Sequence, residues 1–113
     1  MNTSTIYKIH HTFAAVQFAK DNGAHWLLDL IGSHLFCTPA VTQESMTFWT
    51  ITRKGSKAVA VATDGGKGGP EVVLAKQNIP HTDLPVESVR IWTTRTEDRY
   101  GNVIFTIMLP EDY

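Results

Sequence analysis

The segment of residues 24–37, AHWLLDLIGSHLFC, constrains the fold more than any other part of the sequence. Its apolar residues recur at three- and four-residue spacing and extend over most of the circumference of a helix. Only a narrow polar stripe interrupts them, formed by His25, Asp29, Gly32 and Ser33. Because such a helix must be covered on more than one side, we expect a central helix with the rest of the chain folded over it.

A shorter helix is expected just before the central one, starting at His11 or Thr12 and running to about Lys20. The sequence around Gly23 ends this helix, because glycine readily adopts the left-handed cap conformation. After the central helix, Pro39 is expected to end the helical region, since proline cannot continue a helix.

Beyond residue 45 the pattern changes to the alternation and β-branched composition typical of strands. The expected strands cover residues 46–53, 57–64, 71–79, 88–95 and 102–109. Residues 1–10 are polar and expected to be loosely held, although Ile6, Tyr7 and Ile9 could dock onto the domain. Short links between most consecutive strands indicate antiparallel pairing. The chain is therefore predicted to be a single α+β domain over residues 1–113, with two N-terminal helices packed on one face of an antiparallel sheet of about five strands.

The strand at residues 57–64 alternates strictly, with valines on one face and alanines on the other. Alanine indicates the face on which a helix packs closely. The large aromatic residues are assigned to the core rather than to a ligand site: Phe13, Trp26, Phe48, Trp49 and Phe105. A second apolar sheet face would need a partner or a second copy of the chain to cover it, so a homodimer is an open alternative.

The charges nearly balance, with 10 basic and 11 acidic residues and a formal net charge of −1. This argues against a dedicated nucleic-acid-binding protein, although a local basic patch remains compatible with it. The one cysteine, Cys37, excludes an intrachain disulfide and fits a reduced compartment. The sequence shows neither a secretory signal nor an apolar segment long enough to span a bilayer. We therefore expect a cytoplasmic protein with no membrane partner.

Five short segments occur in order along nearly the whole chain: AHWLLDLIGSH at 24–34, FWTI at 48–51, DGG at 64–66, IPHTDLP at 79–85 and LPEDY at 109–113. On these segments the sequence resembles a small family of uncharacterised bacterial proteins, a domain of unknown function, carried on phages, plasmids and other mobile elements. The resemblance implies an accessory role in such a setting. It implies no activity, and no catalytic residue follows from it.

His25, Asp29 and Ser33 are spaced four residues apart and share one face of the central helix. Three groups on one helical ridge do not converge on a substrate atom as a catalytic triad does, and no G-x-S-x-G motif is present. We interpret His25 and Asp29 as a paired surface stripe. The histidines match no metal-binding motif, so no metal and no cofactor are predicted.

Two loops between strands carry alternative interpretations. The glycine-rich segment 64–70, DGGKGGP, could form an anion-binding nest, but it joins two strands and is more typical of a flexible hairpin tip. The segment 80–87 is bounded by prolines and contains His81, Thr82 and Asp83. It is either a rigid recognition loop or a turn fixed by hydrogen bonds from Thr82 or Asp83 to the backbone.

Basic residues gather at the ends of the predicted strands: Arg53, Lys54 and Lys57 at one turn, and Arg90, Arg95 and Arg99 near the last hairpin. Trp92 lies beside Arg90, a combination that could stack a base and contact a phosphate. The alternative is that these are solvated faces whose charges block edge-to-edge aggregation.

The leading hypothesis is a non-enzymatic accessory protein that binds and modulates a partner protein, for example as an inhibitor of a host system. The alternative is a small-molecule or nucleotide-binding protein, or a minimal hydrolase, with its site between helices and sheet. A third, weaker hypothesis is binding of single-stranded nucleic acid. No catalytic residue is assigned, and the candidate interaction or ligand residues are His25, Asp29, His81, Thr82, Asp83 and Trp92.

Overall fold

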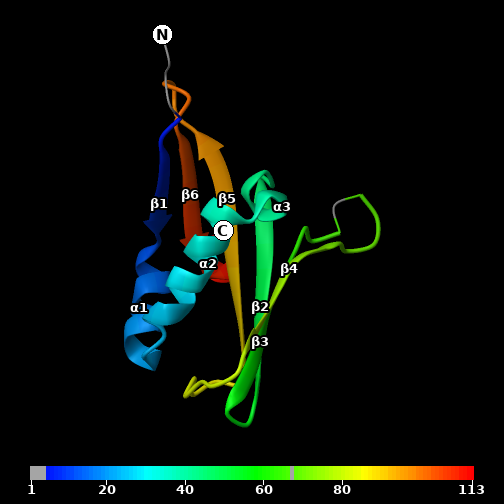
Figure 1. The fold of residues 1–113 in the computed structure, drawn as a ribbon. Coiled ribbons are helices and arrows are strands. Elements are labelled where there is room, and N and C mark those ends of the chain that lie inside the picture. The colour runs from blue at the N-terminus through cyan, green and yellow to red at the C-terminus, as the bar shows by residue number, and fades with distance from the viewer. Residues whose placement is uncertain (1–4, 67) are drawn as a thin grey trace.

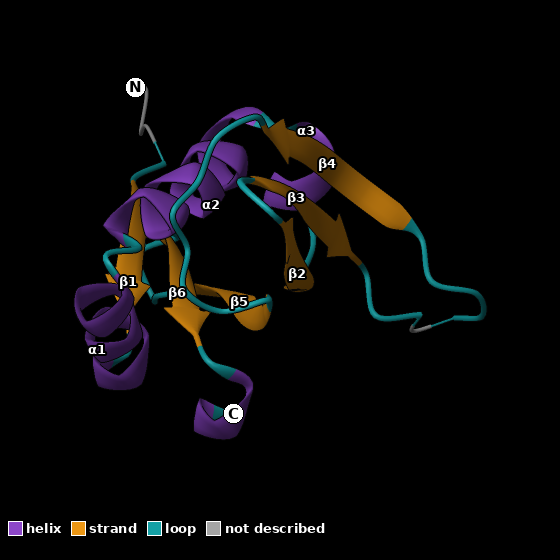
Figure 2. Cartoon of the chain, turned by 90° about the horizontal axis from the view of Figure 1, so that it is seen from below, coloured by secondary structure: helices purple, strands orange, loops and turns teal. Residues whose placement is uncertain are grey.

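The alternating segments of the chain pair into one sheet that curves around a central helix (Figures 1 and 2). This computed structural model describes residues 5–66 and 68–113. The helices are α1 (Phe13–Asn22), α2 (His25–Cys37), α3 (Pro39–Thr42) and the 3-10 helix η1 (Pro110–Asp112). The strands are β1 (Tyr7–His11), β2 (Met46–Lys54), β3 (Lys57–Thr63), β4 (Val73–Ile79), β5 (Ser88–Glu97) and β6 (Val103–Met108).

The sheet has six strands in the order β1-β6-β5-β2-β3-β4, and it is mixed rather than antiparallel. The five expected strands are present and pair antiparallel, but the prediction missed β1, which pairs in parallel with β6. This edge strand spans five residues, of which only Ile9 is half-buried. The sequence of β1 has too little hydrophobic alternation to be recognised as a strand. Backbone hydrogen bonds to β6, rather than buried side chains, hold it in the sheet.

The helices begin and end where their capping residues dictate. The Thr12 side chain accepts a hydrogen bond from the backbone N–H of Ala15 at the start of α1. Gly23 adopts φ 60° and ends that helix, as predicted. Pro39, in contrast, does not end the helical region but opens α3, because a proline at the first position of a helix lacks only an N–H that would be unpaired there anyway.

The core lies between α2 and the inner face of the sheet. Leu27, Ile31 and Leu35 of α2 are fully buried against Trp49 and Ile51 of the central strand β2. Each such side chain contributes about 1.5–3 kcal/mol through burial of apolar surface. The alanines of β3 are buried beneath the helices, as the alternation of residues 57–64 predicted.

The core assignment of the aromatic residues is correct only in part. Trp49 and Phe105 are fully buried, and Trp26 packs against the core while half-buried. Phe13 is 82% exposed on α1, so its assignment to the core is wrong. Phe48 is half-buried on the side of the sheet that faces away from α2, because its neighbour Trp49 occupies the inward position and strand residues alternate.

The side of the sheet facing away from α2 is called here the open face. Its side chains on the central strands are Phe48, Thr50, Thr52 and Lys54 of β2, Lys57, Val59, Val61 and Thr63 of β3, and Ser88, Arg90, Trp92 and Thr94 of β5. Figure 2 shows the helices α2 and α3 on the opposite side of the sheet from η1. None of the helices in the described part of the chain has the length and apolar character needed to cross a membrane.

Candidate functional site

The strongest candidate for a site is a hollow on the open face, formed where β5, β2 and β3 lie side by side. The register places Phe48 between Trp92 and Thr63, and in the next row Thr50 between Arg90 and Val61. The hollow has a volume of about 400 Å³. It is lined by Phe48, Trp49, Thr50, Val61, Thr63, Gly65, Glu71, Arg90 and Trp92.

Two aromatic rings form the apolar part of this hollow. Phe48 and Trp92 meet edge to face, with ring centroids 5.1 Å apart and an interplanar angle of 75°. Tyr113 also contacts Trp92, with ring centroids 5.8 Å apart and an interplanar angle of 67°. Such T-shaped contacts are a favoured arrangement of aromatic pairs, and they define the aromatic end of the hollow.

Gly65 forms one wall of the hollow by close approach to Phe48. A Cβ atom at this position would lie 2.4 Å from a ring carbon of Phe48, and the backbone φ of 75° is one that glycine adopts without strain. The Gly65 N–H donates to Thr63 Oγ1 at 3.3 Å. The glycine at this position therefore serves the packing of the hollow and not only the turn.

The rest of the glycine-rich loop is held by Asp64. Its carboxylate accepts hydrogen bonds from the N–H groups of Gly66, at 2.9 Å, and Val72, at 3.0 Å. Gly69 N–H donates to the Gly66 carbonyl. Because these donors are satisfied within the loop, the geometry favours the hairpin-tip interpretation over an anion nest. Lys67, part of the predicted loop, lies outside the described residues.

The polar rim of the hollow contains one acidic and one basic group. Glu71 accepts a hydrogen bond from Thr63 Oγ1 at 2.7 Å, which fixes its carboxylate at the edge. Arg90 is exposed, and its guanidinium has no hydrogen-bond or ion-pair partner among the described residues. The hollow thus offers an unpaired cation beside an aromatic surface.

Basic residues continue along the open face beyond the hollow. Lys76 of β4 pairs with Val61 and so extends the row that contains Arg90. Lys54 and Lys57 face each other at the end of the β2–β3 hairpin and line a second hollow of about 370 Å³ with Thr52. Among the strand residues that the structure describes, no Asp or Glu points to the open face. The one acidic residue within these strands is Glu97, which lies on the same face of β5 as the inward-facing Thr93.

The predicted site residues of α2 lie away from this hollow. His25 and Asp29 are exposed on α2, on the other side of the sheet from Trp92. No hydrogen bond or ion pair joins them in the described structure, so the expected pairing is not seen. Ser33 donates to the backbone carbonyl of Asp29 at 3.0 Å. Asp29 and Ser33 line a separate groove of about 300 Å³ between β1 and α2.

The loop that holds the other candidates connects β4 to β5 across the ends of β3 and β2. Leu84 is buried, and the N–H of Thr82 donates to the Ser56 carbonyl at 2.7 Å. Thr82 Oγ1 accepts from the N–H of Leu84 at 3.1 Å, as the turn interpretation predicted. His81 and Asp83 are exposed. These contacts give the loop a structural role, and of the six candidates only Trp92 belongs to the hollow.

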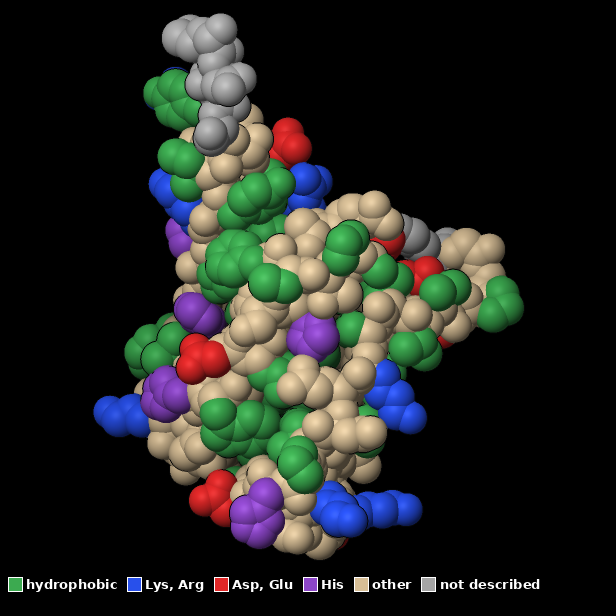
Figure 3. All heavy atoms as spheres, in the orientation of Figure 1, with side chains coloured by type: hydrophobic (Ala, Val, Ile, Leu, Met, Phe, Trp, Pro, Cys, Tyr) green, Lys and Arg blue, Asp and Glu red, His purple; other side chains and the backbone are tan. Residues whose placement is uncertain are grey.

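The helix-covered side shows scattered histidines rather than a cluster, and the purple side chains in Figure 3 lie apart from one another. His34 joins α2 to β4 by a 2.7 Å hydrogen bond between its Nε2 and Gln77 Oε1. Its Nδ1 lies 2.7 Å from Thr38 Oγ1. Among the described residues no group of three or more His, Cys, Asp or Glu side chains is placed to hold a metal ion.

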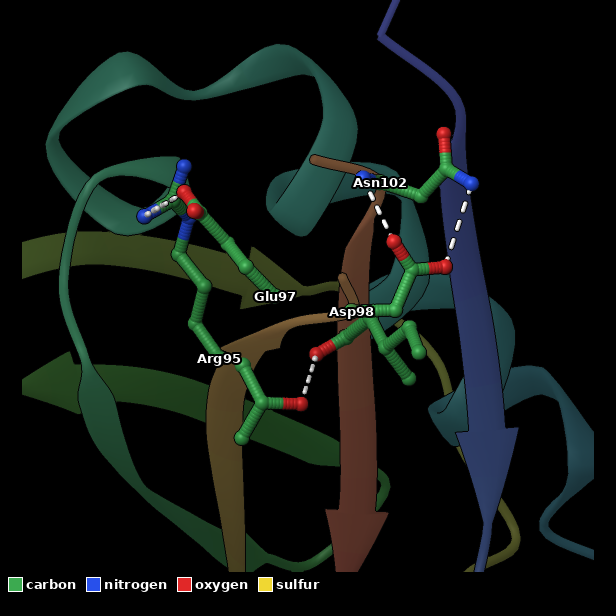
Figure 4. Close-up of polar contacts among 6 residues, drawn as sticks. Arg95, Glu97, Asp98 and Asn102 are labelled. Carbon is green, nitrogen blue, oxygen red and sulfur yellow. Dashed lines mark hydrogen bonds and ion pairs between the residues drawn. The ribbon is translucent and has the colours of Figure 1, made fainter. Parts of the chain in front are cut away.

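The pKa of the Asp98 carboxyl group, in the β5–β6 turn, is shifted, and Figure 4 shows the two hydrogen bonds that Asn102 donates to this group. Burial acts to raise the pKa of Asp98, but hydrogen bonds from the N–H groups of Asn102 and Tyr100 outweigh it. The Asn102 side chain and the charge of Lys8 add to these, so the pKa of Asp98 lies below its ordinary value. We assign this carboxylate to the turn and not to a site.

Sequence reasoning identified the Trp92–Arg90 pair from strand alternation but missed Phe48 and Gly65 of the hollow and Lys76 beyond it. Phe48 could have been assigned to the open face, because side chains alternate along a strand and the alternate residues Trp49 and Ile51 face the core. Gly65 and Lys76 reach the site only through pairing of β3 with β2 and β4. No local pattern reveals those registers.

One family model matches the chain over residues 1–113, and its description is that of a family of unknown function (DUF6876). This agrees with the expectation of a family without an assigned activity. The match carries no information about phages or mobile elements. No curated protein and no solved structure was found to match the chain.

Proposed function

The chain belongs to the family of unknown function DUF6876, and from its geometry we propose that it is a binding protein whose open face binds a polyanionic partner. The observation that supports this most strongly is the gathering of basic side chains on the strands of the open face, where Glu71, at the rim of the hollow, is an acidic neighbour outside the strands. A chain of net charge −1 places Lys54, Lys57, Lys76 and Arg90 on one sheet face, without a carboxylate among the described strand residues of that face.

The pairing of Lys54 with Lys57 strengthens the argument. Like charges directly opposite each other on neighbouring strands destabilise a sheet. Neither ammonium group has a carboxylate partner among the described residues. A polyanion bound across this face would relieve the repulsion and gain Coulomb energy from several groups at once. Because the groups are exposed, salt would weaken the interaction.

Retention on immobilised heparin, a sulfated polyanion, tests the proposal. The double variant Lys54→Glu/Lys57→Glu should elute at clearly lower salt than the wild type. The matched control is Lys20→Glu/Arg99→Glu, which makes the same change in net charge at exposed positions on α1 and the β5–β6 turn. Equal loss of retention in both variants, or no retention of the wild type, would contradict a specific open-face site.

The accessory role in a phage, plasmid or other mobile-element setting, and the modulation of a host system, form part of this proposal. They rest on the resemblance of the sequence segments described above. A polyanion-binding face fits such a role, because replication and defence systems act on nucleic acids and on proteins that hold them.

An exposed aromatic cluster supports a second candidate function, the binding of a partner protein. Tyr7 of β1 is 45% exposed and Phe36 of α2 is 51% exposed, and their rings meet at 6.4 Å between centroids. The groove that contains Asp29 lies beside Phe36. Aromatic side chains are enriched at protein interfaces. A protein that is retained by the wild type and by Trp92→Ala, but is lost on Phe36→Asp, would support this function.

A further inference from the structure

We infer that the polyanion is a single strand of nucleic acid, with a base stacked in the hollow of Phe48 and Trp92 and its phosphates along the basic side chains. This inference rests on the proposed function, because it names the partner of the same open face. It differs from the sequence-based hypothesis of a ligand site between helices and sheet, a space that the core side chains fill.

The hollow supplies the surface on which a base could stack. Its volume of about 400 Å³ is within the range of small-ligand sites. Trp92 and Phe48 are half-buried and meet at an interplanar angle of 75°, so part of each ring remains accessible to a base. Stacking on aromatic rings is tolerant of sequence, because every base has a π-face.

The phosphate contacts follow from the position of Arg90. It lies two residues from Trp92 on the same strand face, and both line the hollow. A base on the aromatic rings would therefore place an adjoining phosphate near an unpaired guanidinium. Thr50 separates Arg90 from Val61 in the same row, and Lys76 lies beyond them. Polar and basic groups thus lie on the Arg90 side of the aromatic end, and the Glu71 carboxylate lies elsewhere on the rim.

The basic side chains extend far enough for more than one nucleotide. Phe48 and Lys54 are six residues apart on β2, which corresponds to about 20 Å at the rise of a strand. A second hollow with Lys54 and Lys57 lies at that end of the face. A free mononucleotide would occupy only the aromatic end, whereas a strand would reach both.

The combination of aromatic and basic groups favours a single strand over the other polyanions. In a duplex the bases are stacked on one another, and single strands are the form in which they can be taken up by aromatic side chains. An acidic protein surface would satisfy the lysines but would leave the Trp92 hollow without a role. Heparin has charge and no base.

The experiment compares oligonucleotides that differ only in their bases. Fluorescein-labelled dT12, rU12 and an abasic 12-mer of deoxyribose phosphate are titrated with the full chain, and anisotropy is measured at several salt concentrations. We expect dT12 or rU12 to bind about tenfold or more tightly than the abasic strand, from stacking of a base. We also expect affinity to fall as salt rises.

Variants of Trp92 and Arg90 test which part of the hollow binds the base and which part binds a phosphate. Trp92→Ala should bring the affinity for dT12 down to that for the abasic strand, and Phe13→Ala, an exposed aromatic on α1, should change neither. Arg90→Gln should weaken all three strands and reduce the salt slope by about one. Arg99→Gln is its exposed control at the β5–β6 turn. Circular dichroism checks that each variant is folded. If Trp92→Ala is not folded, the affinities of the wild type for dT12, rU12 and the abasic strand still decide whether a base is bound.

The outcomes separate this inference from the proposed function. The abasic strand could bind as well as dT12 and rU12 while retention on heparin still depends on Lys54 and Lys57. In that case no base binds in the hollow, and only the proposal of a polyanion-binding open face is supported. Tighter binding of polyglutamate than of dT12 would also overturn the inference, in favour of an acidic protein. If no polyanion binds in a manner that depends on Lys54 and Lys57, both proposals fail.

Discussion

Single side chains fix two of the turns that shape this molecule. At the β5–β6 turn, Asp98 accepts hydrogen bonds from the backbone N–H and the side chain of Asn102 (Figure 4) and from the backbone N–H of Tyr100. At the β3–β4 turn, Asp64 accepts from Gly66 and Val72. Hydrogen bonds to a charged acceptor are stronger than those between neutral groups, so each turn is held mainly by one carboxylate.

The turn at Asp98 predicts a pH dependence of stability. Its pKa is lower in the folded protein than its ordinary value of 3.8. The charged form therefore stabilises the fold above about pH 4, and this contribution is lost as the pH falls below that value through the folded pKa. Asp98→Asn should lower the urea concentration at the unfolding midpoint at pH 7. The difference in this midpoint between the variant and the wild type should become smaller from pH 4 to pH 2.

Asp83→Asn provides the control for this prediction, because Asp83 is exposed and makes no hydrogen bond through its side chain in the described structure. It should leave the urea midpoint nearly unchanged at both ends of the pH range. A difference for Asp98→Asn that stays constant down to pH 2 would show that charge is not the cause.

Gly65 predicts a second effect at the scale of one residue. Gly65→Ala places a methyl group 2.4 Å from Phe48 in a backbone conformation with φ 75°. The conformational term alone costs about 1–2 kcal/mol, and the displaced ring should add to it. Gly68→Ala is the matched control in the same loop, where a Cβ atom would meet nothing within 4 Å. Thermal unfolding of both variants gives the comparison, and equal stability of the two would show that the Phe48 contact does not restrict this position.

At the scale of elements, β3 shows how one strand serves two different faces. Ala60 is fully buried beneath the helices, and Val61 lies on the open face. We expect Ala60→Leu to lower the free energy of unfolding by about 1–3 kcal/mol, because extra methyl groups in a packed core force neighbours apart. Val61→Leu, on the same strand, should change it by less than 1 kcal/mol, roughly as for surface positions. Urea denaturation measures both, and an equally tolerant Ala60 would mean that the helices do not pack closely here.

The elements that could be predicted from the sequence are those with a strong periodic pattern. The central helix and the five antiparallel strands were expected within a few residues of their observed ends. β1 was missed because it is short, polar and held by backbone pairing, and α3 because a proline that ends one helix can begin the next. The site was predictable only at Trp92 and Arg90, which share one strand. The parts contributed by β2, β3 and the glycine-rich loop depend on pairing between distant segments.

At the scale of the whole molecule, the sheet is expected to differ in stability from its centre to its edge. β2 and β5 pair along most of their length and carry fully buried side chains, whereas β1 is an edge strand with only Ile9 half-buried. Few buried contacts allow local opening without global unfolding. Native-state hydrogen exchange should therefore show the amides of β1 exchanging well before those of β2 and β5. Uniform protection across the sheet would contradict this gradient.

The parallel pairing of β1 with β6 also has a consequence for the order in which the protein is made. The backbone N–H of Ile6 is hydrogen-bonded to the side chain of Asn102, 96 residues further along the chain. A ribosome releases the N-terminal segment first, so β1 must wait for its partner while the helices and the β2–β3 hairpin emerge. During synthesis the backbone groups of β1 therefore stay without their strand partner until β6 is released.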